Sequence, residues 1–178
     1  GSGGGISSDE GDEIELLHAT ISDTHAGASG GGFQNSGGTI RMGNSILADN
    51  TAAVSSPDLL GGLTSLDFNV IGDTSNSSLL GPIANTHLNT DARLGPLADN
   101  GGRTLTHTLL VGSPAIDAGS SGMTLAAGLT TDQREFNRIL DIESIPNADG
   151  GVDMGAVEVI GLSVSDGAAN EGDGVMNF

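Results

Sequence analysis

A repeat with a period of about 26 residues is the feature that most restricts how this chain folds. The run Gly3–Ile6 returns as Gly30–Phe33 after 27 positions, and His18–Ala26 returns as Asn44–Ala52 after 26 positions. A degenerate third copy, Phe68–Thr74, begins 24 positions after the start of the second. Periods of about 20 to 50 residues are typical of proteins in which one structural unit stacks on the next. The sequence therefore predicts stacked units over its first 75 residues.

The units are predicted to be strands rather than helices. Each contains short aliphatic or β-branched runs separated by Gly, Asn, Ser and Asp, and none shows a helical period. Stacking in register places parallel strands about 4.8 Å apart. Ile14 then lies beside Ile40, and Ile21 beside Leu47. The predicted fold is all-β: a parallel β-helix, or β-solenoid, whose C-terminal end carries long capping loops.

The charge of the chain limits its partners. The sequence has 23 Asp and Glu against five Arg and no Lys, a formal net charge of -18. Nucleic acids and anionic lipids are bound chiefly through Lys and Arg, so neither is an expected partner. No apolar run reaches the roughly 18 residues that a membrane-spanning helix needs, so we expect no membrane insertion. Such an acidic surface instead favours divalent cations.

The second half of the chain resembles a known family. Leu94–Gly102, Thr104–His107 and Gly112–Gly119 look like the closing region of bacterial right-handed parallel β-helix proteins with a choice-of-anchor C-terminal domain. Thr131–Arg134 and Asp153–Glu158 continue the same pattern in order. The resemblance implies a right-handed β-helix within a large secreted or surface-anchored bacterial protein. It implies no particular activity.

Three regions are predicted. Residues 1–78 form rungs of a longer β-helix, and residues 79–160 form the final rungs and a loop-rich C-terminal cap. Residues 161–178 are a linker and the truncated start of a β-sandwich module, because Leu162–Gly174 is similar to the opening strand of a Calx-beta module. The sequence begins and ends in mid-pattern, so we expect a piece of a longer chain.

Calcium is the one predicted cofactor. Oxygen-bearing side chains at Asn147, Asp149 and Asp153 surround a Gly-Gly turn, and Asp141 and Glu143 lie just upstream. Calcium takes six to eight oxygen ligands, and glycine permits the tight turn that brings them together. The spacing lacks the position-12 Glu of an EF-hand. The alternative is an ordinary Asp-Gly turn before the last strand.

A second acidic group is predicted at a turn of the stack. Asp23, Asp49 and Asp73 occupy equivalent positions of the three copies, so stacking aligns them in a column. Like charges about 4.8 Å apart repel and raise carboxylate pKa values unless cations or hydrogen-bond donors intervene. The alternative is that each Asp accepts hydrogen bonds from local amides in an Asx-turn.

The arginines of the second half are predicted to hold the closing loops. We expect Arg103 or Arg134 to pair with Asp117 or Asp132 and to tie these loops over the last rung. A solenoid needs such a polar cap, because its last rung otherwise exposes an apolar face and strand edges.

No catalytic site is predicted. The chain has no Trp, Tyr or Lys, only four Phe, and four His without metal-binding spacing. The first hypothesis is thus a non-catalytic, structural or adhesive part of a secreted or cell-surface bacterial protein, a stalk or scaffold for an unknown surface or matrix ligand. One alternative is the C-terminal part of a polysaccharide lyase or hydrolase whose catalytic rungs precede Gly1. Another is a filament subunit that associates end to end through its strand edges.

Overall fold

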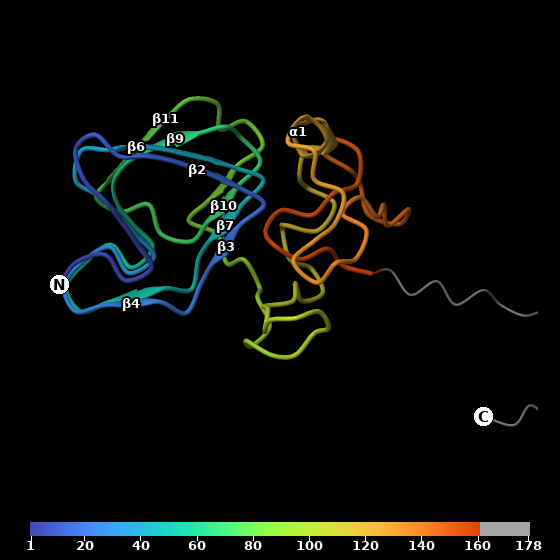
Figure 1. Cartoon of the computed structure of the whole chain (residues 1–178), viewed down its shortest axis with the longest axis horizontal. Coiled ribbons are helices and arrows are strands. Elements are labelled where there is room, and N and C mark those ends of the chain that lie inside the picture. The colour runs from blue at the N-terminus through green and yellow to red at the C-terminus, as the bar shows by residue number, and fades with distance from the viewer. Residues whose placement is uncertain (161–178) are drawn as a thin grey trace, which may run out of the picture.

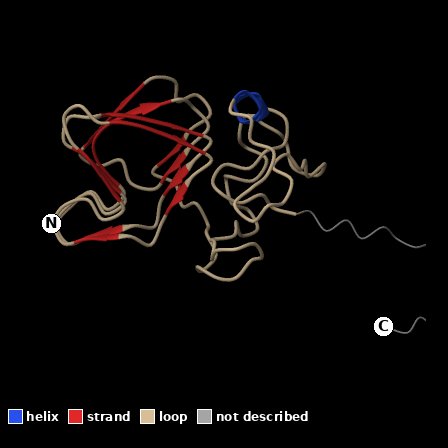
Figure 2. Ribbon diagram, in the orientation of Figure 1, coloured by secondary structure: helices blue, strands red, loops and turns tan. Residues whose placement is uncertain are grey.

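The computed structural model describes residues 1–160 and consists of short parallel strands joined by long turns (Figures 1 and 2). The strands are β1 (Ile6–Ser8), β2 (Glu13–Leu17), β3 (Thr20–Ile21), β4 (His25–Ala26), β5 (Phe33–Asn35), β6 (Thr39–Gly43), β7 (Ile46–Leu47), β8 (Thr51–Ala52), β9 (Leu59–Ser65), β10 (Val70–Ile71), β11 (Ser77–Leu80) and β12 (His87–Leu88). Every ladder between them is parallel. The expectation of an all-β, parallel architecture is confirmed for this part of the chain.

The chain makes four successive passes, which together form what we call the strand stack (residues 1–90). Pass 1 contains β1–β4, pass 2 contains β5–β8, pass 3 contains β9 and β10, and pass 4 contains β11 and β12. Ile14 pairs with Ile40 and Ile21 with Leu47, as the repeat predicts. The repeat thus sets the register, because each apolar position lies beside its own copy.

The strands form three sheets. One has six strands in the order β1-β5-β9-β6-β2, with β11 also paired to β9. It is continuous because the long strand β9 pairs through its first residues with β5 and through its last with β6. The second sheet has the order β12-β10-β7-β3, and the third consists of β4 and β8. Figure 1 shows these sheets curling around a common interior.

Successive passes become shorter. Phe33 pairs with Ile6, 27 positions earlier, whereas Val70 follows its partner Ile46 by 24 positions and His87 follows Val70 by 17. The shortening explains why the repeat fades in the sequence after residue 75.

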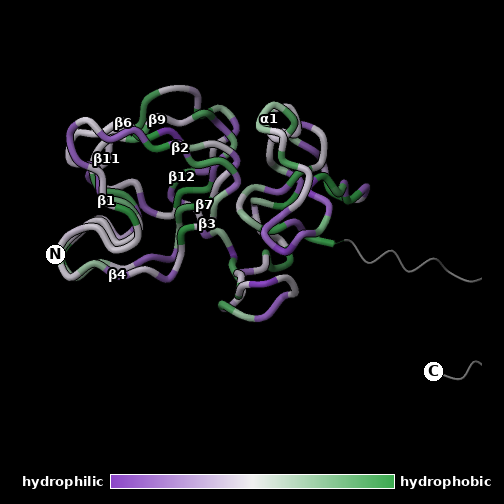
Figure 3. The backbone as a smooth tube through the Cα atoms, viewed as in Figure 1, coloured by the Kyte–Doolittle hydropathy of each residue, from purple (hydrophilic) through white to green (hydrophobic). Residues whose placement is uncertain are grey.

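Two apolar clusters hold the described chain together, and the second sheet separates them. The first fills the stack interior and contains Phe33, Ile40, Met42, Leu47, Leu59, Leu63 and Ile71. The second lies outside β7 and β10 and contains Ile46, Ala48, Val70, Ala92, Leu109, Ala115, Ile116 and Met154. Neighbouring residues of a strand point to opposite faces, so each of these two strands buries one residue on each side. Figure 3 shows the apolar stretches on both sides of this sheet.

The C-terminal segment (residues 91–160) supplies the outer cover of the second sheet. It contains three isolated antiparallel bridges, Leu94 with Leu109, Ala98 with Thr106 and Thr131 with Asn137. It also contains the helix α1 (Ser121–Ala126), which the sequence did not predict. Within residues 1–160, no helix is long and apolar enough to cross a membrane.

This segment was expected to close the last rung, but it lies beside the stack (Figure 1). The Ala156 amide donates to Thr20 in pass 1, and the Gly155 amide donates to the Asn44 carbonyl in pass 2. Met154 and Val70 of pass 3 belong to the same apolar cluster. Loops that touch three passes act as a lateral brace. The predicted sandwich module at 161–178 lies outside the described residues.

Glycine is required in the turn that precedes β1 and in its copy that precedes β5. A Cβ atom on Gly31 would collide with the carbonyl oxygens of Thr51 and Pro57, and one on Gly4 would collide with the carbonyl oxygen of Gly31. These oxygens belong to the backbone and cannot move aside as a flexible side chain can. The Gly-Gly-Gly copies therefore mark a steric requirement of stacking.

We predict that Gly31→Ala destabilises the protein, while Gly27→Ala in the neighbouring turn does not. The added methyl group overlaps backbone at position 31, which should cost at least about 2 kcal/mol of unfolding free energy. At position 27 the nearest atoms lie 3.6 Å away, an ordinary contact distance. Urea unfolding followed by circular dichroism measures both. Equal stabilities of the two variants would contradict the close backbone approach.

Candidate functional site

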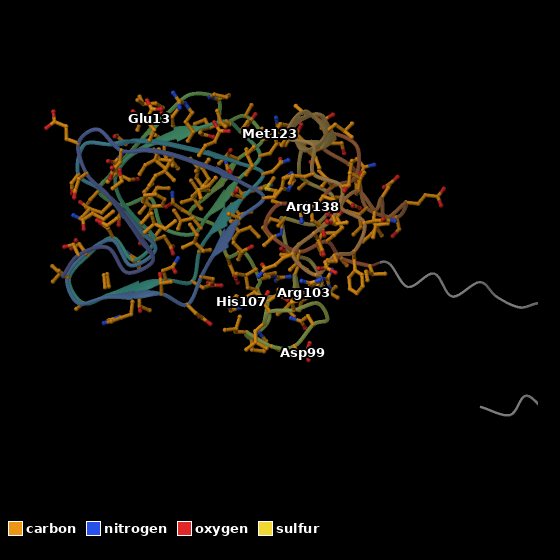
Figure 4. All side chains as sticks on the ribbon, in the orientation of Figure 1. Glu13, Asp99, Arg103, His107, Met123 and Arg138 are labelled. Atoms are coloured by element: carbon orange, nitrogen blue, oxygen red, sulfur yellow. The ribbon has the colours of Figure 1, made fainter. Side chains whose placement is uncertain are left out.

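The polar residues that cluster most densely lie where the strand stack meets the C-terminal segment, an interface that we call the seam. Figure 4 shows Arg138 at this interface, with Met123 of α1 above it and His107 below. The seam combines a buried network of charged groups with two adjoining cavities. We describe the network first, because it determines how the cavities are held.

Two turn residues of the stack anchor α1. His18 and Asn44 occupy the same corner of passes 1 and 2, both with positive φ, at 52° and 48°. The Asn44 side chain accepts from the Ser120 amide at 2.8 Å and donates to the Ser120 carbonyl at 2.8 Å. It thereby replaces the backbone partner that a neighbouring strand would supply. The Asn44 side chain thus holds Ser120, the N-cap residue of α1, against the stack.

His18 is neutral and carries its proton on Nε2. Its Nδ1 accepts from Arg138 Nε at 3.1 Å, and its Nε2 lies 2.8 Å from Thr124 Oγ1, which itself donates to the Ser120 carbonyl. Because a guanidinium can only donate, Nδ1 is an acceptor and the proton of the neutral ring is on Nε2, which also lies 2.9 Å from the Asn44 side-chain nitrogen. Burial lowers the pKa of His18 to about 3, and the Arg138 charge acts in the same direction. The ring therefore joins the stack to both α1 and Arg138 without carrying charge.

Arg138 is 1% exposed and links three parts of the seam. Its guanidinium contacts His18 Nδ1, the Gly155 carbonyl and, at 3.4 Å, the Asp153 carbonyl. Its Nη1 has no hydrogen-bond partner among the described residues. Burial lowers the pKa of Arg138, and the carboxyl groups of Glu158, Asp132 and Asp153 oppose this shift when they are ionised. At neutral pH the ionised carboxylates beside the cation are those of Asp132 and Asp153.

Asp153 and Glu158 form a buried acidic pair behind Arg138. The Asp153 carboxylate accepts from the amides of Asp117 at 2.7 Å and Val159 at 2.6 Å, and the Glu158 carboxyl accepts from the Asp153 and Leu140 amides. Burial raises the pKa of Asp153 to about 6 and that of Glu158 to about 9, and the charge of Asp153 adds to the shift of Glu158. Glu158 is therefore protonated at neutral pH.

Asp132 and Arg134 form the buried ion pair that the sequence predicted between an arginine and an aspartate of this region. Arg134 donates to Asp132 Oδ2 from Nε at 2.9 Å and from Nη2 at 2.7 Å, and its side chain also lies over the Phe136 ring. Burial alone would raise the pKa of Asp132, but the hydrogen bonds from the Glu158 amide and Arg134 outweigh it and lower the pKa. Arg103 instead pairs with Glu135 at the surface.

The contacts of this network suit a structural role rather than catalysis. Its carboxyl groups are almost fully buried and accept hydrogen bonds mostly from backbone amides. A general acid or base must reach a substrate atom, which these groups cannot do while the seam is closed. What the arrangement does is to fix residues 117–158 against the corners of passes 1 and 2.

Two cavities open along the same seam and share Thr20, Gln133 and Ala156. The larger, about 420 Å³, lies beside His18 and Arg138. The smaller, about 260 Å³, lies between β3 and the loop that carries His107. Together they line the outer edge of the network, where the C-terminal segment does not pack fully against the stack.

The five predicted calcium ligands do not come together. Asn147 donates to Asp141 at 3.1 Å on the surface, and Asp149 accepts from Ser120, the N-cap residue of α1, at 2.6 Å. Asp153 points inward to the buried pair, and Glu143 is exposed. Within residues 1–160 no three His, Asp or Glu side chains are placed to hold a metal ion. Calcium binding remains a prediction from the sequence.

The predicted acidic column is present in part. Asp23 and Asp49 both adopt positive φ, and partial burial and the charges of Asp91 and Asp23 raise the pKa of Asp49. Asp73 differs, because its Oδ1 accepts from the Ser75 amide at 2.7 Å as in an Asx-turn. The first two copies keep the acidic turn and the third uses its aspartate locally.

Sequence reasoning missed Arg138, Glu158 and the contact of His18 with the C-terminal segment. His18 and Arg138 are 120 positions apart, so no spacing connects them. One signal was present: Ile46-Leu47 and Val70-Ile71 place two apolar residues in succession, which predicts a strand buried on both faces. That pattern required a cover over the outer face.

Comparison with known protein families, with curated proteins and with solved structures found no match to this chain. The resemblance to the closing region of choice-of-anchor β-helix proteins therefore stays a prediction.

The raised pKa of Glu158 predicts a stability that falls in alkali. In the unfolded chain this carboxyl ionises near 4.5, whereas in the folded chain it does so near 9. Between these values the folded state holds a proton that the unfolded state releases, so the unfolding free energy decreases as pH rises, by at most about 1.4 kcal/mol per pH unit. From about pH 7.5 to 9 the shifts of His18 and Asp153 add little to this slope, because both groups are then deprotonated in the folded and in the unfolded chain.

Urea unfolding at several pH values in this range measures the slope. Glu158→Gln keeps the shape of the protonated side chain and should remove most of the slope, while Glu10→Gln on the surface should leave it unchanged. Identical slopes for all three proteins would show that Glu158 does not hold its proton.

Proposed function

We propose that this chain is a non-catalytic structural or adhesive part of a large secreted or cell-surface bacterial protein. It acts as a rigid stalk or binding scaffold, in the form of a right-handed parallel β-helix. The observation that carries the proposal is the lateral brace: the C-terminal segment touches passes 1, 2 and 3 through one buried network and one apolar cluster. Because each pass of a stacked-strand protein otherwise contacts only its neighbours, such a brace suits a part that transmits force.

The distribution of ionisable groups supports a non-catalytic role. The groups with the largest pKa shifts, His18, Asp153 and Glu158, lie inside the seam and are used to join the segments. Perturbed pKa values are a mark of active sites where the groups also face a cleft. Asp153 and Glu158 line neither cavity of the seam, and His18 borders the larger cavity with both ring nitrogens already in contact with Arg138 and Thr124. The surface is strongly acidic, which favours solubility over association with nucleic acid or anionic membranes.

The proposal predicts that the stack and the C-terminal segment behave as one rigid body. The chain has no cysteine, so two introduced cysteines can be spin-labelled without background. Labels at Glu13→Cys in β2 and Leu125→Cys in α1 should give a single narrow distance distribution. A reference pair within the stack, Glu13→Cys and Val54→Cys, defines the width expected of a rigid structure.

Pulsed electron spin resonance measures both distributions. Widths that agree for the two pairs support the stalk. A broad or two-peaked distribution for the pair that crosses the seam would contradict it, because a hinged segment cannot serve as a rigid spacer.

A further inference from the structure

The smaller of the two cavities has a polar end and an apolar wall. The wall consists of Leu97, Leu105 and Val157, of which the two leucines are about half exposed. The polar end consists of Ser22, Asp23 and His107. An elongated ligand with one polar terminus and an aliphatic stem fits such a lining better than a flat or uniformly polar ligand.

His107 presents a hydrogen-bond acceptor to this cavity. Its Nδ1 lies 2.8 Å from the Gly95 carbonyl, which can only accept, so Nδ1 carries the proton of the neutral ring. The lone pair is then on Nε2, which has no hydrogen bond to any of residues 1–160 and lies 3.7 Å from Asp23 Oδ2. The His107 side chain is only 10% exposed. The ring is thus largely buried, while its Nε2 stays accessible from the cavity and can accept a hydrogen bond from a ligand donor.

Asp23 faces the same point with an acceptor of its own. Its side chain is 63% exposed and accepts no hydrogen bond from the described residues. Two acceptors separated by 3.7 Å can share one donor atom placed about 2.8 to 3.0 Å from each. The hydroxyl of Ser22, beside them, also has no partner within the described part of the chain. Two acceptors without a hydrogen-bond donor among the described residues, His107 Nε2 and the Asp23 carboxylate, thus face each other at the polar end of the cavity.

The surrounding charge selects a cation at that position. Asp49 lies close enough to both Asp23 and Asp91 for their charges to add to the rise of its pKa that burial causes. The residues that line this cavity include no arginine, and the sequence contains no lysine, so no side chain of this chain or of a second copy supplies an ammonium group. A metal ion would lack ligands, because among residues 1–160 no third His, Asp or Glu is in position.

We propose that this cavity binds a primary alkylammonium group from outside the chain, with the ammonium between His107 Nε2 and Asp23 and its stem along Leu97 and Leu105. An ammonium has three donors and no acceptor, so it can donate to His107 Nε2 and to the Asp23 carboxylate at the same time. A lysine side chain of a partner protein and a free alkylamine or diamine present the same chemistry. The site adds a binding activity to the structural role proposed above.

Titration of the full chain with n-butylammonium chloride at pH 8 and low salt tests the site directly. The probe should cause a saturable change in the His107 side-chain ¹⁵N resonances. Butan-1-ol, which has the same stem and no charge, should bind at least about fivefold more weakly, the factor that corresponds to one partly exposed ion pair. No change at His107, or equal effects of the two probes, would overturn the proposal.

Two variants of equal charge separate a local contact from the general acidic field. Asp23→Asn should weaken butylammonium binding about fivefold, while Glu10→Gln, a surface change on the far turn, should alter it less than twofold. Equal effects would mean that only the net charge attracts the probe, and the site would be rejected. Both positions are exposed, so both variants should keep the fold, and their amide spectra verify it.

Two larger probes distinguish the sources of the amine. Tighter binding of N-acetyl-lysine methylamide than of butylammonium supports a lysine of a partner protein, and tighter binding of cadaverine supports a free diamine. If neither binds, the cavity does not accept an aminoalkyl group and the proposal fails.

Discussion

The burial of β7 and β10 on both faces is the constraint on which the rest of the structure depends. Leu47 and Ile71 face the stack interior, while their neighbours Ile46 and Val70 face outward. Each fully buried aliphatic side chain contributes about 1.5–3 kcal/mol, so the outer pair cannot stay in water without a large loss of stability. The C-terminal segment packs beside the stack and buries this outer face, and its residue Met154 belongs to the same apolar cluster as Ile46 and Val70.

The apolar cover is directed by polar groups at the corners of the stack. Asn44 and His18 bind α1 and Arg138, and the charge of Arg138 is balanced by acids of the C-terminal segment. Burying ions is costly, and replacing them by apolar residues often stabilises a protein. What such a network adds is a defined position, because an apolar face alone would let the covering loops slide. We therefore attribute the rigidity of the seam to the network and its stability to the apolar cluster.

The stack could be predicted from the sequence and the seam could not, for a physical reason. Repeated side chains must lie beside their own copies, so the period alone gives the pairing of Ile14 with Ile40 and of Ile21 with Leu47. The seam joins positions that differ by more than 100 residues and have no period, as His18 and Arg138 do. The spacing of Asp149 and Asp153 resembled half of a calcium loop, but spacing does not reveal that Asp153 points inward.

The in-register stacking of successive passes is the central claim, and cysteine crosslinking measures it most directly. Glu13 and Thr39 are both exposed and stand opposite each other on neighbouring strands, whereas Ser78 lies on the same sheet but is not adjacent to Glu13. Paired residues on neighbouring strands lie about 4.8 Å apart, which is within the Cα separation of about 4.4–6.8 Å that a disulfide spans. A short thiol-specific crosslinker should therefore join Glu13→Cys to Thr39→Cys rapidly. It should not join Glu13→Cys to Ser78→Cys. Equal yields for the two pairs, or none for the first, would contradict the stacked-strand architecture.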